Sequence, residues 1–301
     1  MIVYRYFGGV IEKIAQPEAS ILYGDLIFTT FRAFGSLIPW WGHHLERLRL
    51  GTIFLASHNG QTNCAVWDLM RQSLEDARSK FLHHFQDQQW IGRPTIIRHD
   101  GELSQRSCPQ GGGPGGPTAI KRQGEGLQLM FFAWEAPVLQ STGQKLAVSL
   151  SERKRDLPAE VKGGDYVIEN KGRQWAITLG MDDILFWQGS QKKISESSTS
   201  NIFLISRKGE ILTPATSGGS CLAGIAREQV MLLVKRLGLQ LREREICLSE
   251  LEQMQEAFLT NCGQLIRPVS QINDYFLSSS HDNSLTNKLK KELNFKWGNC
   301  L

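Results

Sequence analysis

Two residues of opposite charge stand in segments that suit covalent chemistry. Lys162 lies in EVKGGDY, and Glu196 lies in ISESSTSNIFLI, a run that passes from a polar turn to an apolar strand. An amine can form a Schiff base with an aldehyde, and a carboxylate can keep a pyridine nitrogen protonated, which are the two groups that pyridoxal phosphate chemistry requires. Either residue by itself would more commonly be a solvated surface charge, so the pair needs support from other segments.

Two further segments carry groups that could hold a phosphate. CLAGIAREQV, residues 221–230, is typical of a turn that opens a helix. A helix N-terminus presents unpaired backbone N–H groups and the positive end of the helix dipole, so Gly224, Ile225 and Ala226 could cradle a phosphate. Arg47, in HHLERLRLG, could clamp the same group from a separate part of the chain. The four pieces would then converge on one cofactor.

Taken in order along the chain, these segments resemble the fold-type IV pyridoxal phosphate enzymes, also called class IV aminotransferases. That group includes D-amino acid aminotransferase, branched-chain aminotransferase and aminodeoxychorismate lyase. The resemblance runs from YGDLIFTTFRAFGSLIPWWGHHLERLRLG through RPTIIRHDG, EVKGGDY and ISESSTSNIFLI to LTPATSGGSCLAGIAR and AFLTNCGQLIRPV. It implies a two-domain fold of α+β or α/β class, like that of D-amino acid aminotransferase, with the cofactor between the domains and a homodimer partner completing the pocket.

The resemblance also implies a role for each matching residue. Lys162 would form the internal aldimine and move protons between the substrate Cα and the cofactor C4′, and Glu196 would pair with the pyridinium nitrogen. Arg47 would bind the phosphate, to which Ile225 and Ala226 would donate backbone N–H groups. Because a protonated pyridine accepts a carbanion's charge, Glu196→Gln is expected to slow proton abstraction more than it weakens cofactor binding.

Several positions depart from the usual wording of this family. Ala226 stands where relatives often have Thr, which removes a hydroxyl contact to the phosphate, and Cys262 stands at another expected cofactor contact where many relatives have a small hydroxyl residue or Ala. Gly163–Asp165 follow Lys162 in an unusual order, and Thr29 replaces the Glu of the common Phe-Glu-Thr run. These changes predict an altered pocket.

Arg98, Arg106 and Tyr166 are candidates for contacts to the substrate or to the cofactor's phenolic oxygen. A guanidinium fork suits bidentate recognition of a carboxylate, and in the resembling family the region of RPTIIRHDG contributes to the substrate pocket. A surface arginine is an equal alternative for Arg98 and the more common one for Arg106. Residues 100–125, which include QGGGPGGPT, predict an excursion between strands without regular structure.

Three functions stay open for such a site. The leading one is 4-amino-4-deoxychorismate lyase, which gives 4-aminobenzoate and pyruvate for folate synthesis. The spacing from Lys162 to Ala176 matches the lyase and D-amino acid aminotransferase pattern without a gap, and RPTIIRHDG looks closer to the lyase. The alternative is a class IV aminotransferase of D-amino acid or branched-chain type, which transfers an amino group to a 2-keto acid. A non-catalytic pyridoxal phosphate-binding protein is a third, against which the intact Lys162, Glu196 and Arg47 argue.

The chain is expected to hold an N-terminal α/β domain, a linker around Pro137 and a C-terminal cofactor-binding domain, over residues 1–133, 134–142 and 143–301. LIFTTFRAFGSLI alternates well enough to pair as an antiparallel hairpin element. Apolar spacing and polar punctuation predict helices over residues 41–56, 64–85, 165–180 and 226–239, and an amphipathic helix or tail over residues 286–296. Lys171 falls on a charged face of the third helix and is not expected to be the Schiff-base lysine.

Composition agrees with an enzyme that takes a small-molecule amino substrate. A chain of 301 residues, 41% hydrophobic and 21% charged, can bury a substantial core. The net charge of +4 is small and the basic residues are spread out, which gives no case for nucleic acid binding. The six cysteines lack metal-ligand spacing, MIVYRYFGGVIEKIAQ does not match a signal peptide, and no apolar run reaches the length of a membrane span, about 18 residues. No metal, no membrane association and a cytoplasmic location are therefore expected.

Overall fold

The structure is a computed structural model of the 301-residue chain. It describes residues 3–7, 10–14, 26–56, 64–99, 126–140, 142–153, 155–164, 166–217 and 219–298. The excursion expected at residues 100–125, with Arg106, lies outside them, as does Asp165. The chain divides into two compact units, Met1–Pro137 with Val161–Asp165, and Val138–Glu160 with Tyr166–Leu301.

The first unit is built on an antiparallel sheet with the spatial order β2-β1-β6-β5-β3, and β4 also pairs with β5. The strands are β1 (Val3–Phe7), β2 (Val10–Ile14), β3 (Leu26–Phe28), β4 (Phe31–Phe34), β5 (Gln89–His99) and β6 (Gly126–Glu135). The expected hairpin element at LIFTTFRAFGSLI is wrong in its pairing, because β3 and β4 both pair with β5. All four side chains of β4 are buried, so the strand does not alternate as a half-exposed hairpin would.

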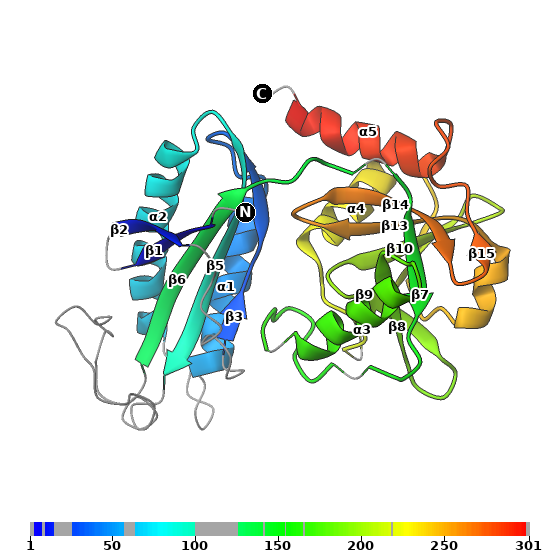
Figure 1. Ribbon diagram of the computed structural model, residues 1–301, viewed down its shortest axis with the longest axis horizontal. Helices are drawn as coiled ribbons and strands as arrows, with labels where there is room; N and C mark the ends of the chain where they lie inside the picture. Colours follow the sequence, from blue (N-terminus) through cyan, green and yellow to red (C-terminus); the bar gives the residue numbers. More distant parts are fainter. Residues whose placement is uncertain are drawn as a thin grey trace. The chain divides into compact units, whose positions relative to one another are not determined.

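Two helices pack on this sheet, α1 (Trp41–Ala56) and α2 (Cys64–His84), as Figure 1 shows. Both lie where apolar spacing predicts helices. The core beneath them is aromatic: Phe31 meets Trp90 edge-on at 5.4 Å between ring centroids, and Phe81 lies 4.8 Å from Phe131. Such ring pairs stabilise a core beyond the area that they bury. The core fixes the position of α1, which carries Arg47.

The second unit holds a larger sheet with the order β12-β11-β10-β13-β14-β7-β8-β9, and β15 pairs with β14. Its strands are β7 (Gln144–Val148), β8 (Asp183–Gln188), β9 (Lys193–Ser197), β10 (Asn201–Ser206), β11 (Ile211–Pro214), β12 (Leu241–Arg244), β13 (Met254–Asn261), β14 (Leu265–Ile272) and β15 (Tyr275–Phe276). The apolar core cluster draws on strands across this sheet, with Leu146 on β7 and Leu204 on β10 fully buried.

Three α-helices and a short 3₁₀ helix cover parts of this sheet (Figure 1): α3 (Val167–Thr178), α4 (Ile225–Arg236), α5 (Leu285–Gly298) and η2 (Leu248–Gln253). The first three match the helices that apolar spacing predicts. α3 packs closely on β8, since a Cβ on Gly172 would come within 2.9 Å of Ile184 Cδ1. α3 therefore begins at a fixed place beside the sheet.

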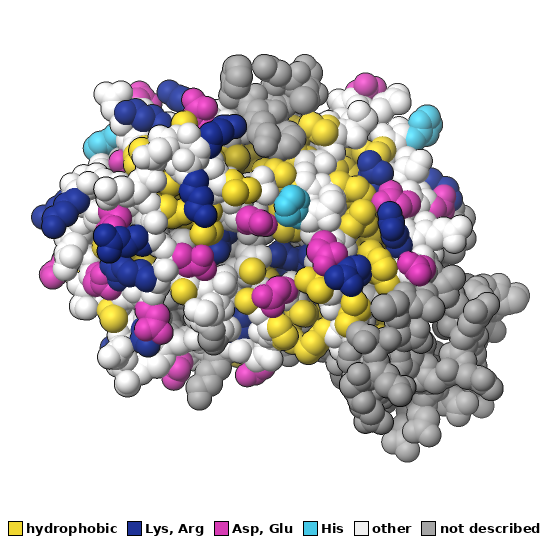
Figure 2. Space-filling model, turned by 180° about the vertical axis from the view of Figure 1, so that it is seen from behind, with side chains coloured by type: hydrophobic (Ala, Val, Ile, Leu, Met, Phe, Trp, Pro, Cys, Tyr) yellow, Lys and Arg dark blue, Asp and Glu magenta, His cyan; other side chains and the backbone are white. Residues whose placement is uncertain are grey.

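The surface mixes charges of both signs. On the face drawn in Figure 2, lysine and arginine side chains are interspersed with acidic ones and with apolar patches. No helix within the described ranges is long and apolar enough to cross a membrane.

Candidate active site

Lys162 belongs to the first unit, where its segment runs beside β3. The amide of Phe28 donates to the carbonyl of Lys162 at 2.8 Å, and the amide of Gly164 donates to the carbonyl of Leu26 at 3.1 Å. Ile27 and Gly163 form an antiparallel bridge between these two bonds. The segment thus behaves as a short extra strand, which holds the lysine backbone against the sheet.

The unusual glycines after Lys162 have a physical reason. A Cβ on Gly163 would overlap the carbonyl oxygen of Leu26, so only glycine lets the two backbones approach this closely. Gly164 has φ +81°, in the left-handed region that other residues rarely adopt. The Gly-Gly pair is therefore needed to seat the lysine segment on β3.

The Lys162 side chain is half-buried and lies over an aromatic ring. Its Nζ is 5.2 Å from the centroid of Phe28, and the guanidinium of Arg93 is 4.8 Å from the same centroid. A ring face attracts cations, so Phe28 steadies the amine without forming a covalent or ionic bond to it.

α1 brings a buried histidine close to these positive charges. His44 is fully buried, and its Nδ1 lies 2.6 Å from the hydroxyl oxygen of Thr29. Burial, and then the charges of Arg47, His43 and Lys162, hold the pKa of His44 well below its usual range, so the imidazole is neutral. Its Nε2 is buried and has no hydrogen-bond partner within the described residues. The sequence pattern indicates Arg47 on this helix but does not indicate His44. The one related signal is Thr29, the hydrogen-bond partner of His44, which replaces the Glu that is common in the family.

Glu196 lies on β9 in the second unit, within a strand and not in the polar turn expected from the sequence. The turn comes one residue later, where the Ser197 amide donates to the Ser200 carbonyl at 2.8 Å. The carboxylate is buried, with Oε2 accepting the Leu222 amide at 3.0 Å and Oε1 accepting Arg153 Nη1 at 3.0 Å. These bonds hold the carboxylate in one orientation.

Arg153 joins Glu196 to a second buried carboxylate. Its Nε donates to Glu169 Oε1 at 2.9 Å, its Nη2 pairs with the same oxygen, and its guanidinium lies 5.2 Å from the Phe186 ring centroid. Burial acts to lower the pKa of Arg153, but the charges and hydrogen bonds of Glu196 and Glu169 outweigh it and raise that pKa. Neither Arg153 nor Glu169 can be recognised from the sequence, because nothing local marks a residue whose partners are distant along the chain.

The N-terminus of α4 forms a tight cradle. Gly224 is the N-cap residue, and no side chain in the described part of the chain caps the helix there. A Cβ on Gly224 would overlap Oδ1 of Asn201, whose Nδ2 donates to the Leu222 carbonyl at 2.7 Å and lies 3.4 Å from Glu196 Oε2. The amides of Ile225 and Ala226 open the helix beside this point. One asparagine therefore ties the helix N-terminus to the carboxylate on β9.

Buried hydroxyls near these elements lack protein partners. Ser197 Oγ and Ser198 Oγ follow Glu196 directly, and Thr260 Oγ1 lies on β13, opposite Asn201 in the sheet register. None of the three has a hydrogen-bond partner among the residues that the structure describes. Buried polar atoms are normally satisfied, so orphaned ones beside an uncapped helix fit a site for a polar ligand. Together with Glu196 they suit a group that carries both a phosphate and a basic ring.

The remaining candidates are placed as follows. Arg98, on β5, donates from Nη1 to the Leu55 carbonyl at 2.9 Å, at the end of α1. Tyr166 is the residue before α3, and Cys262 lies in the turn between β13 and β14, where Asn261 Oδ1 accepts the Gln264 amide at 2.8 Å. Their predicted contacts to substrate and cofactor stay predictions.

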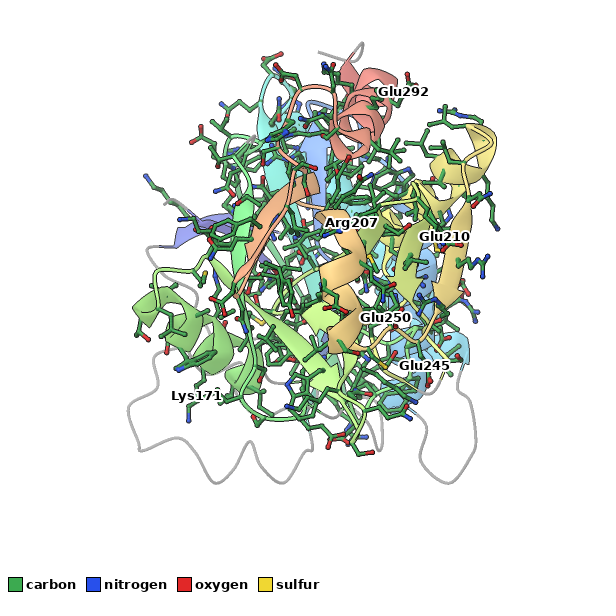
Figure 3. The ribbon with its side chains drawn as sticks, turned by 90° about the vertical axis from the view of Figure 1, so that its right-hand side faces the viewer. Lys171, Arg207, Glu210, Glu245, Glu250 and Glu292 are labelled. Carbon is green, nitrogen blue, oxygen red and sulfur yellow. The ribbon has the colours of Figure 1, made fainter. Side chains whose placement is uncertain are left out.

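Two sequence expectations about other residues can be compared with the structure. Lys171 lies on α3, is exposed and points outward (Figure 3), which agrees with its solvated charged face. Cys221, Cys247 and Cys262 form no disulfide among the residues that the structure describes. Within the described residues no group of histidine, cysteine and acidic side chains could hold a metal ion.

Comparison with protein families gives one match that spans most of the chain. Residues 26–272 match the family described as amino-transferase class IV. A probable branched-chain-amino-acid aminotransferase of Aquifex aeolicus is 31% identical over 96% of this chain and 90% of its own length. Branched-chain-amino-acid aminotransferase 2 of Bacillus subtilis is 36% identical over 43% of this chain, and that match spans only 37% of the relative's length.

Solved structures resemble the fold over nearly the whole chain. An aminotransferase from Brucella abortus, bound to the cofactor PLP, has a TM-score of 0.73 and 19% identity and covers 99% of both chains. A putative 4-amino-4-deoxychorismate lyase from Legionella pneumophila has a TM-score of 0.69 and 21% identity over 90% of this chain and 91% of its own. At these identities the likeness concerns the fold.

Proposed function

The chain belongs to the amino-transferase class IV family, and from that membership we propose that it transfers an amino group between a branched-chain amino acid and a 2-keto acid. The observation that carries the proposal is the Aquifex aeolicus relative, a probable branched-chain-amino-acid aminotransferase that matches 96% of this chain at 31% identity. The residue spacing after Lys162 matches both the lyase and the D-amino acid aminotransferase, and RPTIIRHDG looks closer to the lyase. A relative aligned along the full chain outweighs that spacing, because the lyase-like structure supports the fold alone.

The enzyme uses pyridoxal 5′-phosphate, which supplies an aldehyde for the substrate amine and a ring that withdraws electrons from the substrate Cα. The residues of the second unit fit this group. The amides of Ile225 and Ala226 at the start of α4, which no described side chain caps, suit the phosphate, and the glycine at position 224 leaves room for Asn201 Oδ1 beside them. Glu196 suits a protonated ring nitrogen, since both of its oxygens are already oriented by hydrogen bonds.

We assign the covalent link and the proton transfer at Cα to Lys162. A general base works best when it is held in place and partly shielded from water. Lys162 meets both conditions, because β3 fixes its backbone and the Phe28 ring lies under its amine. Arg47, on α1, is assigned to the phosphate, where a guanidinium provides paired donors. Both assignments follow the family resemblance, and the contacts of Lys162 with β3 support its role.

Two assays on the cofactor-loaded protein test the reaction. In the first, L-leucine, L-isoleucine or L-valine is mixed with 2-oxoglutarate, and we expect repeated formation of glutamate. In the second, aminodeoxychorismate is supplied without a keto acid, and we expect no repeated release of 4-aminobenzoate. Repeated release of 4-aminobenzoate and pyruvate would show a lyase instead, because an aminotransferase stops after one half-reaction when it has no acceptor. Activity with D-amino acids alone would retain the aminotransferase and overturn the substrate class.

A mapping experiment tests which lysine binds the cofactor covalently. Borohydride reduction of the loaded protein, followed by peptide mass mapping, should place the pyridoxyl group on Lys162 and not on the exposed Lys171. A label on any other lysine would remove the catalytic assignment. The homodimer stays a prediction of the family resemblance, and the cytoplasmic location stays a prediction of the sequence composition. Sedimentation of the loaded protein tests the homodimer.

A further inference from the structure

Glu196 is buried together with three other charged side chains. The side chains of Arg153, Arg155 and Glu169 are each 9% exposed, and that of Glu196 is 8% exposed. Two guanidiniums therefore face two carboxylates away from water. Buried charges are costly unless they are paired, and here charges of both signs lie together.

Arg153 is shared unequally between the two acids. Glu169 Oε1 accepts from both Nε and Nη2, whereas Glu196 Oε1 accepts from Nη1 alone, at 3.0 Å. A nearby cation makes a carboxylate a weaker acceptor for a second proton donor. The larger the share of Arg153 that Glu169 takes, the stronger Glu196 stays as an acceptor.

Arg155 and Cys221 are the other charged or titratable groups that lie near Glu196 among the residues that the structure describes. Arg155 Nη1 lies 4.0 Å from Glu196 Oε1. Cys221, just before α4, carries no charge at neutral pH, since burial and then the charge of Glu196 raise the pKa of its thiol to about 11. Arg153 is thus the charged group that bonds Glu196 directly at hydrogen-bond distance, and Glu169 acts on Glu196 through its own bonds to Arg153.

We propose that Arg153 and Glu169 are positioning residues that set how strongly Glu196 holds a proton on the cofactor ring nitrogen. The proposal rests on the assignment of Glu196 to that nitrogen in the proposed function. Glu169 lies in the first turn of α3, and α3 begins five residues after Lys162. Glu169, which shares the Arg153 guanidinium with Glu196, therefore lies on the helix that follows the lysine segment in the chain.

The direction in which each variant changes the protonation of the ring nitrogen distinguishes this role from a purely structural one. Glu169→Gln removes a negative charge and leaves Arg153 to Glu196, so the ring nitrogen should lose its proton more readily. Arg153→Gln removes the competing cation, so the ring nitrogen should keep its proton more firmly. A role limited to folding would instead lower the stability in both variants and leave the ring unchanged.

The experiment uses the holoenzyme loaded with pyridoxal phosphate that is ¹⁵N-labelled in the ring, whose ¹⁵N chemical shift reports the ring proton as the pH is raised. We expect the midpoint of the ring-nitrogen titration to move down by about one pH unit in Glu169→Gln and up by about one pH unit in Arg153→Gln. A shift of this size is usual for one contact between charges. Glu250→Gln is the matched control, because Glu250 pairs with Arg244 at 2.7 Å elsewhere in the second unit (Figure 3). It should leave the midpoint unchanged.

The outcomes separate the proposal from its premise. If the wild-type protein binds no labelled cofactor, the proposed function is overturned as well. The same holds if Glu196→Gln leaves the protonation of the ring nitrogen unchanged. Normal binding with unchanged midpoints, or with shifts of the same sign in both variants, overturns only the role of Arg153 and Glu169. If Arg153→Gln fails to fold, Glu169→Gln alone decides. This variant keeps the Arg153–Glu196 pair and leaves no carboxylate buried without a cation.

Discussion

Phe28 holds Lys162 at two points. Its backbone amide donates to the Lys162 carbonyl at 2.8 Å, and its ring centroid lies 5.2 Å from Lys162 Nζ. One residue of β3 therefore fixes both the backbone and the amine of the lysine. Because this clamp depends on close backbone approach, substitutions that widen it should affect cofactor attachment before they affect the rest of the fold.

Gly163→Ala should push the lysine segment away from β3. The added Cβ would overlap the Leu26 carbonyl oxygen, and overpacking of this kind costs about 1–3 kcal/mol. We expect a lower free energy of unfolding in urea and less cofactor trapped on Lys162 by borohydride. Gly42→Ala is the control, since nothing lies within 4 Å of its Cβ position. Unchanged trapping in Gly163→Ala would contradict the clamp.

Lys162→Ala should separate binding from chemistry. The phosphate contacts assigned to Arg47 and to α4 do not involve this side chain, so the variant should still bind pyridoxal phosphate, noncovalently. Turnover should fall to background, because the assigned proton carrier is gone. Equilibrium dialysis and the aminotransferase assay measure the two effects, with Lys171→Ala as the active control. Normal turnover in Lys162→Ala would sink the mechanism.

His44 should make the protein less stable in mild acid. Its pKa is held well below the usual value by burial and by neighbouring positive charges, so the unfolded chain takes up a proton that the folded chain refuses. The contribution of His44 to the free energy of unfolding is complete above the pKa of the histidine in the unfolded chain, about 6.5. It is lost as the pH falls below that value, by about 1.4 kcal/mol per pH unit. Urea unfolding at pH 8, 6.5 and 5.5 measures the slope.

His44→Gln should flatten that slope, whereas the same change at the exposed His281 should not. A variant that keeps the full slope would place the acid sensitivity elsewhere.

Cys221 should resist alkylation in the native protein. Its thiol is buried, and burial followed by the charge of Glu196 raises its pKa to about 11, so the reactive thiolate is scarce at pH 8. Iodoacetamide labelling with peptide mass mapping should leave Cys221 unmodified, while labelling in urea should modify it. The half-buried Cys247 and Cys262 provide an internal comparison. Rapid native labelling of Cys221 would contradict the buried environment.

The sequence predicts those features that depend on neighbouring residues in the chain. The helix over residues 41–56 follows from apolar spacing alone, and the N-terminus of α4 follows from a glycine before a helical pattern. The partners of Glu196 could not be predicted, because Arg153 and Asn201 reach it only through the folding of the sheet. The antiparallel bridge between Ile27 and Gly163 is equally hidden, since it joins segments far apart in the chain.

The path of the backbone through residues 161–165 limits how this protein can be dissected. A fragment of residues 1–137 would contain β3 but no Lys162, and a fragment of residues 138–301 would contain Lys162 without the Leu26 and Phe28 backbone groups that seat it. Neither half can therefore be expected to react with the cofactor aldehyde in the native way. Co-expression of the two pieces, with activity as the readout of reassembly, would turn this chain into a split reporter.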